Sequence, residues 1–234
     1  MLERTLNLGI LAHVDAGKTT LTERLLYAAG VIDELGRVDD GTTQTDTLPL
    51  EQRRGITIKS AVVSFAIDDV RVNLIDTPGH PDFIAEVERV LSVLDGAVLV
   101  ISAVEGVQSQ TPLLMRALQR LGVPTLIFVN KLDRVGADPD RVLEEISARL
   151  TPAIVPVDDR ARLAEVLADR DDSLLAAYVE GDGLPYRRLR AELAMQTGRA
   201  LVHPVFAGSA KTGEGVDELM AGIAELLPAS AGDA

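Results

Sequence analysis

The chain has 234 residues, 47% of them hydrophobic and 25% charged, and a formal net charge of -13 at pH 7. Such acidity argues against free-standing binding to DNA or RNA, because proteins that bind nucleic acids neutralise phosphates with clustered Lys and Arg. Cysteine is absent, and no segment has the pattern of a signal peptide or a membrane-spanning helix. We therefore expect a cytoplasmic protein without disulfides, built around one α/β domain.

Predicted strands and helices alternate along the chain, as they do in βαβ units. Continuous apolar runs predict six strands, over residues 6–12, 61–67, 72–76, 97–102, 125–130 and 202–207. Apolar residues at helical spacing predict helices over 18–29, 83–91, 111–121, 140–150 and 216–227. This order predicts a mostly parallel six-stranded sheet with helices on both faces, and ligands at the carboxyl ends of its strands.

Three segments depart from this alternation. Residues 31–59 are rich in Asp, Gly, Thr and Arg without clear periodicity, which predicts a long mobile loop, and loops of such length are more often functional. Residues 152–200 form an insert with helical pieces over 161–168 and 173–179 before a Gly-Asp-Gly turn, so we expect a small subdomain without chemistry of its own. Residues 228–234 have the composition of a linker.

The most informative motif is the segment Ala-His-Val-Asp-Ala-Gly-Lys-Thr at 12–19, between the first predicted strand and the first helix. A loop that enters a helix aims unpaired backbone N–H groups and a positive dipole end at one point, where phosphate groups fit. Gly17 allows a close approach, Lys18 would reach the β- and γ-phosphates, and the Thr19 hydroxyl would bind Mg²⁺. Ala12 departs from the G-x-x-x-x-G-K-[ST] pattern, which has Gly there. The predicted phosphate contacts are His13, Val14, Asp15, Ala16, Gly17, Lys18, Thr19 and Thr20.

A second motif, Asp-Thr-Pro-Gly-His at 76–80, follows another predicted strand. Asp76 at a strand end facing the phosphate loop suits a water-mediated hold on Mg²⁺. Gly79 can donate its N–H to a γ-phosphate because no side chain intervenes. Together with the phosphate loop, this motif indicates a nucleoside triphosphate site.

The identity of the base is predicted by the segment Asn-Lys-Leu-Asp at 130–133, directly after an apolar strand. The Asp133 carboxylate can accept two hydrogen bonds from N1–H and the N2 amino group of guanine, which adenine does not offer. Lys131 would lie along the base plane, and the Ala210 N–H, in Gly-Ser-Ala-Lys at 208–211, could meet guanine O6. The predicted guanine-binding residues are Asn130, Lys131, Asp133, Ser209, Ala210 and Lys211.

These motifs, in this order, resemble the GTPase superfamily, and translational GTPases more than small signalling ones. Residues 54–58 and 76–80 are similar to the switch regions of elongation factor G, which also has Ala at the position of Ala12. The chain is more similar still to the tetracycline ribosomal protection proteins, the Tet(M) and Otr(A) group, over 43–46, 91–97 and 124–131. Because those proteins are much longer, the resemblance implies an isolated G domain over 1–234, with the insert at 152–200 and without the downstream domains.

The resemblance implies GTP hydrolysis to GDP and phosphate, as the switch of a factor that releases tetracycline from the ribosome. His80 would be the catalytic residue, because it occupies the place where the family positions the attacking water. Val14 and Ile56 match a pair that forms an apolar gate beside His80. Asp15 either helps to bind K⁺ or only orders the loop. The implied Mg²⁺ ligands are Thr19, Thr57 and Asp76.

Two alternatives stay open: the G domain of elongation factor G or a related translation factor, and a guanine-nucleotide-dependent binding module with little turnover. An ATP-using P-loop kinase is disfavoured by residues 130–133. The expected partners are GTP or GDP and the ribosome, with no DNA and no membrane, and the expected state is a monomer. Since no arginine stands out as a finger in cis, we expect slow hydrolysis without an activator.

Overall fold

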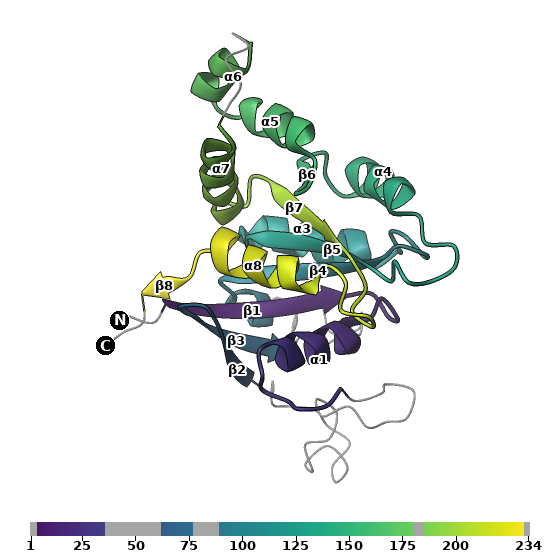
Figure 1. Ribbon diagram of the computed structural model, residues 1–234. Coiled ribbons are helices and arrows are strands. Elements are labelled where there is room, and N and C mark those ends of the chain that lie inside the picture. The colour runs from purple at the N-terminus through teal and green to yellow at the C-terminus, as the bar shows by residue number, and fades with distance from the viewer. Residues whose placement is uncertain (1–3, 36–61, 77–88, 180–184, 232–234) are drawn as a thin grey trace.

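The computed structural model describes residues 4–35, 62–76, 89–179 and 185–231 (Figure 1). Its strands are β1 Arg4–Ala12, β2 Val62–Ile67, β3 Val70–Asp76, β4 Gly96–Ser102, β5 Thr125–Asn130, β6 Ile154–Pro156, β7 His203–Ala207 and β8 Ser230–Ala231. They form one sheet in the order β2-β3-β1-β4-β5-β7-β6, with β8 beside β1. The pairs β2–β3 and β1–β8 are antiparallel, and the other pairs are parallel.

All six predicted strands are present, but the described part of the sheet has eight strands, so the predicted number is too small. β6 is not predicted, because this strand has only three residues and lies within the insert. β8 is not predicted either, because it has only two residues, in the tail for which a linker is expected. These two residues pair with Arg4 and Thr5 and thereby join the tail to the sheet.

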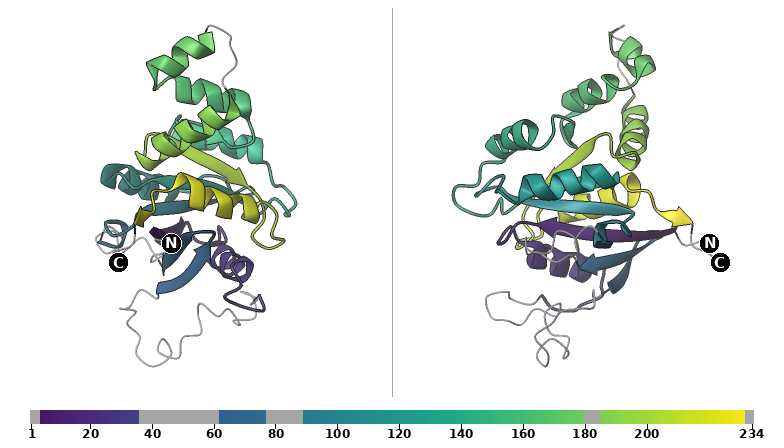
Figure 2. Two further views of the ribbon diagram at one scale, coloured as in Figure 1. Left: turned by 60° about the vertical axis from the view of Figure 1, so that its left-hand side comes forward. Right: turned by 180° about the vertical axis from the view of Figure 1, so that it is seen from behind.

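Helices cover both faces of the sheet, as expected (Figures 1 and 2). Their bounds are α1 Lys18–Ala28, α3 Thr111–Leu121, α4 Pro139–Arg149, α5 Arg160–Ala168, α6 Asp172–Val179, α7 Tyr186–Gly198 and α8 Val216–Leu226. Of the helix predicted over 83–91, only residues 89–91 lie in the described part, and they are helical. Most of the predicted loop at 31–59 lies outside the described residues.

The core has two halves, because successive side chains of a strand point to opposite faces of the sheet. In β4, Val98 and Val100 pack with the buried side chains of α1 and α8, whereas Leu99 and Ile101 pack with those of α3 and α4. All four are fully buried, and burying a side chain of this size contributes about 1.5–3 kcal/mol. Burial on both faces explains why the central strands are apolar throughout their length.

The insert lies at one end of the molecule, where α5, α6 and α7 are attached through β6 to the edge of the sheet (Figure 1). Its buried leucines belong to the same apolar cluster as the face covered by α1 and α8; they are Leu163, Leu167, Leu174, Leu189 and Leu193. The insert therefore shares the core of the main sheet. No helix in the described ranges has the length and apolar character needed to cross a bilayer.

Candidate nucleotide-binding site

The loop between β1 and α1 forms the phosphate-binding half of the candidate site. Asp15 and Gly17 have positive φ angles of 64° and 99°, and the Ala16 N–H donates to the His13 carbonyl at 3.2 Å. Gly17 is the N-cap of α1, where no side chain makes a capping hydrogen bond and the first turn holds no acidic residue. No capping side chain or acidic residue of this first turn therefore competes with an anion for the positive dipole end of α1.

Asn130, at the end of β5, joins this loop to the loop that follows β7. Its Nδ2 donates to the Ala16 carbonyl at 2.9 Å, and its Oδ1 accepts the Ala210 N–H at 2.9 Å. The side chain is buried, and a Cβ at Gly17 would collide with its Nδ2. Gly17 is therefore required both by its backbone conformation and by the close approach of Asn130.

Asp133 is held by the loop after β7. The Ser209 hydroxyl donates to Asp133 Oδ1 at 2.6 Å, and it accepts the Thr212 N–H at 3.2 Å. Ser209 is fully buried, whereas the Asp133 side chain keeps 18% of its surface exposed. Asp133 Oδ2 lies 3.9 Å from Arg134 Nε. The carboxylate is thus oriented through one oxygen and still accessible to a ligand.

Several residues predicted to touch guanine have partners within the protein. The amide of Asn130 is occupied at both ends, the Ser209 hydroxyl supports Asp133, and the Ala210 N–H donates to Asn130. Lys131 has a positive φ of 71°, and its Nζ lies 3.2 Å from both carboxylate oxygens of Glu105. The structure therefore gives these side chains a supporting role, and their contacts with the base stay predictions.

Glu105 pairs with Lys131 of the candidate site, but no sequence motif includes it, and it is not among the predicted site residues. It follows β4, accepts a hydrogen bond from Ser102 Oγ and faces Lys131 across the site. The same loop is joined to α4, because Arg141 donates to the Val104 carbonyl at 2.9 Å. Glu145 of α4 accepts the Val107 N–H, also at 2.9 Å. No pattern in the sequence indicates these contacts, since they link residues 37 or 38 positions apart.

Two histidines are buried and neutral at pH 7. Burial lowers the pKa of His13, an effect that the nearby Glu105 carboxylate partly opposes, and His13 Nδ1 has no hydrogen-bond partner among the described residues. Burial lowers the pKa of His203 to about 4, although its Nδ1 donates to the Thr125 carbonyl at 3.3 Å. His203 lies in β7 and supports the sheet beside β5.

The predicted metal and catalytic residues are only partly covered by the structure. Thr19 lies half-buried in the first turn of α1, and Asp76 is the last residue of β3, paired in register with Ile10 of β1. His80, Gly79, Thr57 and Ile56 lie outside the described residues. The described ranges hold no group of three His, Cys, Asp or Glu side chains that could bind a metal. A Mg²⁺ ion held largely by phosphates and water needs no such group, so Thr19 beside the uncapped helix fits this ion.

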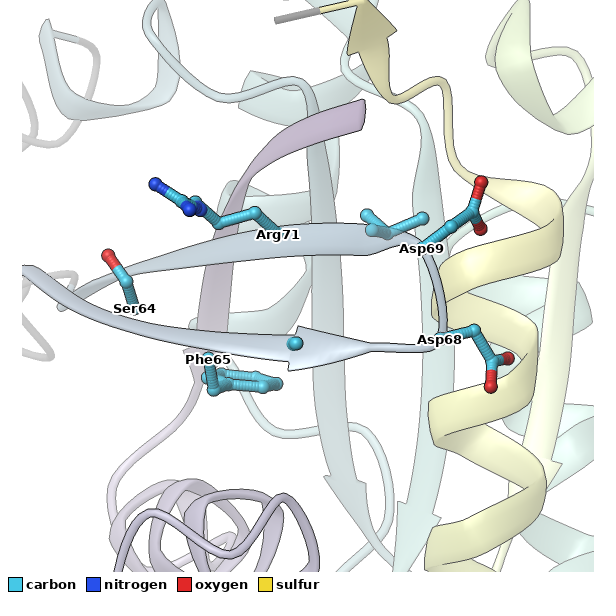
Figure 3. A pocket seen from close by; sticks show the side chains of 7 residues that line it. Ser64, Phe65, Asp68, Asp69 and Arg71 are labelled. Atoms are coloured by element: carbon cyan, nitrogen blue, oxygen red, sulfur yellow. The ribbon is translucent and has the colours of Figure 1, made fainter. Parts of the chain in front are cut away.

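A separate hollow of about 320 Å³ lies on the β2–β3 hairpin (Figure 3). It is lined by Ser64, Phe65, Ala66, Asp68, Asp69, Val70 and Arg71, none of which belongs to a predicted motif. Figure 3 shows Asp68 and Asp69 at the hairpin turn, where Asp69 Oδ1 accepts a hydrogen bond from Arg4 Nη2 at 2.8 Å. This open hollow on the hairpin is separate from the candidate site. That site is formed by the loops at the carboxyl ends of β1, β5 and β7.

Comparison with known proteins agrees with this geometry. The chain is 60% identical to the oxytetracycline resistance protein of Streptomyces rimosus, over 95% of this chain and 37% of that protein. It is 52% identical to the tetracycline resistance protein TetM of Streptomyces lividans, over 97% of this chain and 38% of the relative. The chain thus spans less than two-fifths of the length of these relatives.

A crystal structure of a Thermus thermophilus protein has the same fold, with a TM-score of 0.83 and 29% identity over 97% of this chain and 41% of the other. The family model described as "Elongation factor Tu GTP binding domain" matches residues 3–229. This match includes the phosphate loop, Asp133 and the loop after β7. The chain therefore belongs to the family of elongation factor Tu GTP-binding domains.

Proposed function

We propose that this chain binds GTP with Mg²⁺, hydrolyses it to GDP and phosphate, and acts as the nucleotide switch of a ribosome-associated factor. The observation that carries the proposal is the double hydrogen bond of Asn130, which joins the Ala16 carbonyl to the Ala210 N–H. Through this side chain, the phosphate-binding loop and the loop that supports Asp133 become one rigid unit. Such an arrangement fits a ligand that has phosphates at one end and a guanine at the other.

Guanine selectivity in this proposal rests on Asp133. Its carboxylate would accept hydrogen bonds from N1–H and the N2 amino group, while Ser209 holds one oxygen in place at 2.6 Å. Hydrogen bonds to a charged group contribute about 1.5–3 kcal/mol each, so a base without these donors is rejected by orders of magnitude. Lys131, paired with Glu105, would keep its aliphatic stem beside the base.

For hydrolysis, we infer that Thr19, Thr57 and Asp76 hold Mg²⁺, the last of them through a water. When bound, the ion neutralises charge on the phosphates. Lys18 at the start of α1 would contact the β- and γ-phosphates. His80 would hold the attacking water, Val14 with Ile56 would form the apolar gate before it, and Asp15 would order the loop or help to bind K⁺. Val14 is 59% exposed, so its side chain is available for this contact.

The whole factor, we propose, is a ribosomal protection protein that releases tetracycline from the ribosome. Support comes from relatives named as tetracycline resistance proteins, which are 44–60% identical to this chain. In this account the chain is a monomer and the ribosome is its activator. Two functions compete with this proposal. The chain could instead be the G domain of elongation factor G or a related translation factor, or a guanine-nucleotide-dependent binding module with little turnover.

The test measures phosphate release from GTP by the 234-residue chain. It is repeated in a chimera in which this chain replaces the matching part of the Streptomyces rimosus relative. Alone, the chain should turn over slowly, on the order of 10⁻⁴ to 10⁻² s⁻¹, because no arginine stands out in the sequence as a finger in cis. Ribosomes should stimulate the chimera, and His80→Ala should abolish the stimulation while GDP affinity stays unchanged.

Three outcomes would contradict parts of this proposal. If the chain hydrolysed many GTP molecules per second without ribosomes, the proposed role of the ribosome as activator would be wrong. Equal loss of binding and hydrolysis in His80→Ala would make His80 structural. A chimera that hydrolyses GTP with ribosomes yet gives bacteria no tetracycline resistance, where the parent relative does, would favour the elongation factor.

A further inference from the structure

Arg24 of α1 contacts the loop that follows β7. Its Nε donates to the Ala210 carbonyl at 2.9 Å, and its Nη2 donates to the Lys211 carbonyl. The guanidinium carbon also lies 5.9 Å from the centre of the Tyr27 ring, one turn further along α1. An arginine of the first helix thus binds two consecutive carbonyls of the segment predicted to meet the base.

These contacts fix two peptide planes. The Lys211 carbonyl and the Thr212 N–H belong to one planar peptide. Its oxygen accepts a hydrogen bond from Arg24, and its N–H donates to Ser209 Oγ at 3.2 Å. The Ala210 carbonyl belongs to the preceding peptide, whose N–H is that of Lys211. Because N–H and C=O point in opposite directions across a trans peptide, Arg24 also fixes the direction of the Lys211 N–H.

The Lys211 N–H is the backbone donor that this loop leaves available. The Ala210 N–H already donates to Asn130, and the Thr212 N–H to Ser209. Within the described ranges, no acceptor receives the Lys211 N–H. A base lying against Asp133 would present its 6-position oxygen to this loop.

We propose that Arg24 is a positioning residue for guanine recognition, which holds the Ala210 and Lys211 carbonyls so that the Lys211 N–H donates to guanine O6. This inference rests on the proposed function and revises the contact with O6 that the sequence predicts: the Ala210 N–H already donates to Asn130, so the next N–H of the loop takes its place. It also connects the two ends of the nucleotide, because α1 begins at the phosphate loop and Arg24 lies on the same helix.

The fork of the guanidinium matters, since two carbonyls are bound by two different nitrogens. A lysine offers a compact point charge and does not match a pair of carbonyls in the same way. Gly213 of the same loop lies beside the guanidinium, since a Cβ there would be in ordinary van der Waals contact with Arg24 Nη1, at 3.5 Å. Arg24→Lys should therefore keep the charge and lose most of the positioning.

The experiment measures equilibrium affinities of the chain and its Arg24→Ala and Arg24→Lys variants for GDP, 6-thio-GDP and IDP. The thio analogue has sulfur, a larger and weaker acceptor, in place of the oxygen at position 6, whereas IDP lacks the N2 amino group that Asp133 would bind. In the unchanged chain, GDP should bind about 2- to 12-fold tighter than 6-thio-GDP. This ratio corresponds to the free energy that one neutral hydrogen bond contributes to binding. In Arg24→Ala this ratio should fall below about 2, while the ratio of GDP to IDP stays the same.

Two controls separate positioning from general damage. Arg4→Ala removes an arginine that pairs with Asp69 on the hairpin, and it should leave all three affinities unchanged. Tyr27→Leu removes the ring beside Arg24 and leaves both hydrogen bonds, so the ratio of GDP to 6-thio-GDP should persist. If Arg24→Ala does not fold, the same affinity ratios are compared between the unchanged chain and Arg24→Lys.

The outcomes distinguish the inference from the proposed function. If all three affinities fall equally in the Arg24 variants, the residue is structural and the inference is wrong. If the ratio of GDP to 6-thio-GDP is unaffected, the inference is wrong while guanine binding stands. If the unchanged chain binds ADP as tightly as GDP, the proposed function itself fails.

Discussion

The loops of the candidate site and the insert are stabilised in different ways. The loops at 130–133 and 208–213 are held by directional hydrogen bonds between single polar side chains and backbone atoms, such as those of Asn130 and Arg24. The insert is held by buried leucines of α5 and α7 that pack with the main core. In the loops, one lost side chain misplaces a ligand contact, whereas in the insert it lowers the stability of the fold. Substitutions in the two regions should therefore separate binding from stability.

The largest effect on stability is expected from Leu167→Ala in α5. Leu167 is fully buried, and removing its side chain leaves a cavity in the apolar cluster. Truncations of this kind cost about 2–5 kcal/mol in free energy of unfolding. Denaturant unfolding should show this loss, while the GDP affinity of the folded protein changes less than about 3-fold, because no hydrogen bond of the loops is touched. If Leu167→Ala greatly lowered GDP affinity and left the free energy of unfolding unchanged, the proposed difference between the insert and the loops would be wrong.

Asn130→Ala should differ from Leu167→Ala, because it should lower nucleotide affinity as well as stability. It removes both hydrogen bonds that join the phosphate loop to the loop after β7, and leaves the Ala16 carbonyl and Ala210 N–H without this partner. Each buried group left unpaired lowers the free energy of unfolding by about 1–3 kcal/mol. Because the two loops are then no longer joined, we also expect GDP affinity to fall about 10- to 100-fold. Calorimetric titration measures this, with Asn73→Ala as the matched control. Asn73 also bonds across strands, to Asn7 and Ser64, but lies away from the loops. If Asn73→Ala lowered GDP affinity as much as Asn130→Ala does, the hydrogen bonds of Asn130 would have no special role in binding.

The smallest effect is a pH dependence from His203, which lies between the two regions in β7. Burial lowers its pKa to about 4 from an ordinary value of 6.5, so the unfolded chain binds more protons between these values. The stability contributed by neutral His203 is present above pH 6.5 and is lost as the pH falls towards 4. From pH 7 to pH 5.5 this amounts to about 1 kcal/mol. His203→Gln should flatten the stability profile in this window; an unchanged slope would assign the pH dependence to other groups.

Much of the fold follows from the sequence, because the strands of the central sheet are long and apolar on both faces. Val98 to Ile101 is buried throughout, and such a run is recognisable without any structure. The helix α7 is missed, because Arg187, Arg188 and Arg190 crowd its first turns and only Leu189 and Leu193 supply buried aliphatic side chains. A pattern this weak does not stand out beside the Gly-Asp-Gly segment that precedes it in the sequence.

The candidate site is predictable in its motifs and not in its supports. Lys18, Asp133 and the loop after β7 are found through local sequence patterns. The bonds that organise them join residues 76 to 187 positions apart, as with Ser209 and Asp133 or Arg24 and Lys211. Spacing along the chain carries no information about such contacts, so the supporting roles of Asn130, Ser209 and Arg24 emerge only once the strands are placed side by side.

The central claim is that Asp133 selects guanine, and the most direct measurement is the affinity of Asp133→Asn for GDP and for xanthosine diphosphate. Xanthine has a carbonyl where guanine has its N2 amino group, so an amide that can donate should replace the carboxylate as its partner. We expect GDP affinity to fall at least about 100-fold and the preference to reverse in favour of xanthosine diphosphate. Unchanged GDP affinity in a folded Asp133→Asn protein would contradict the account.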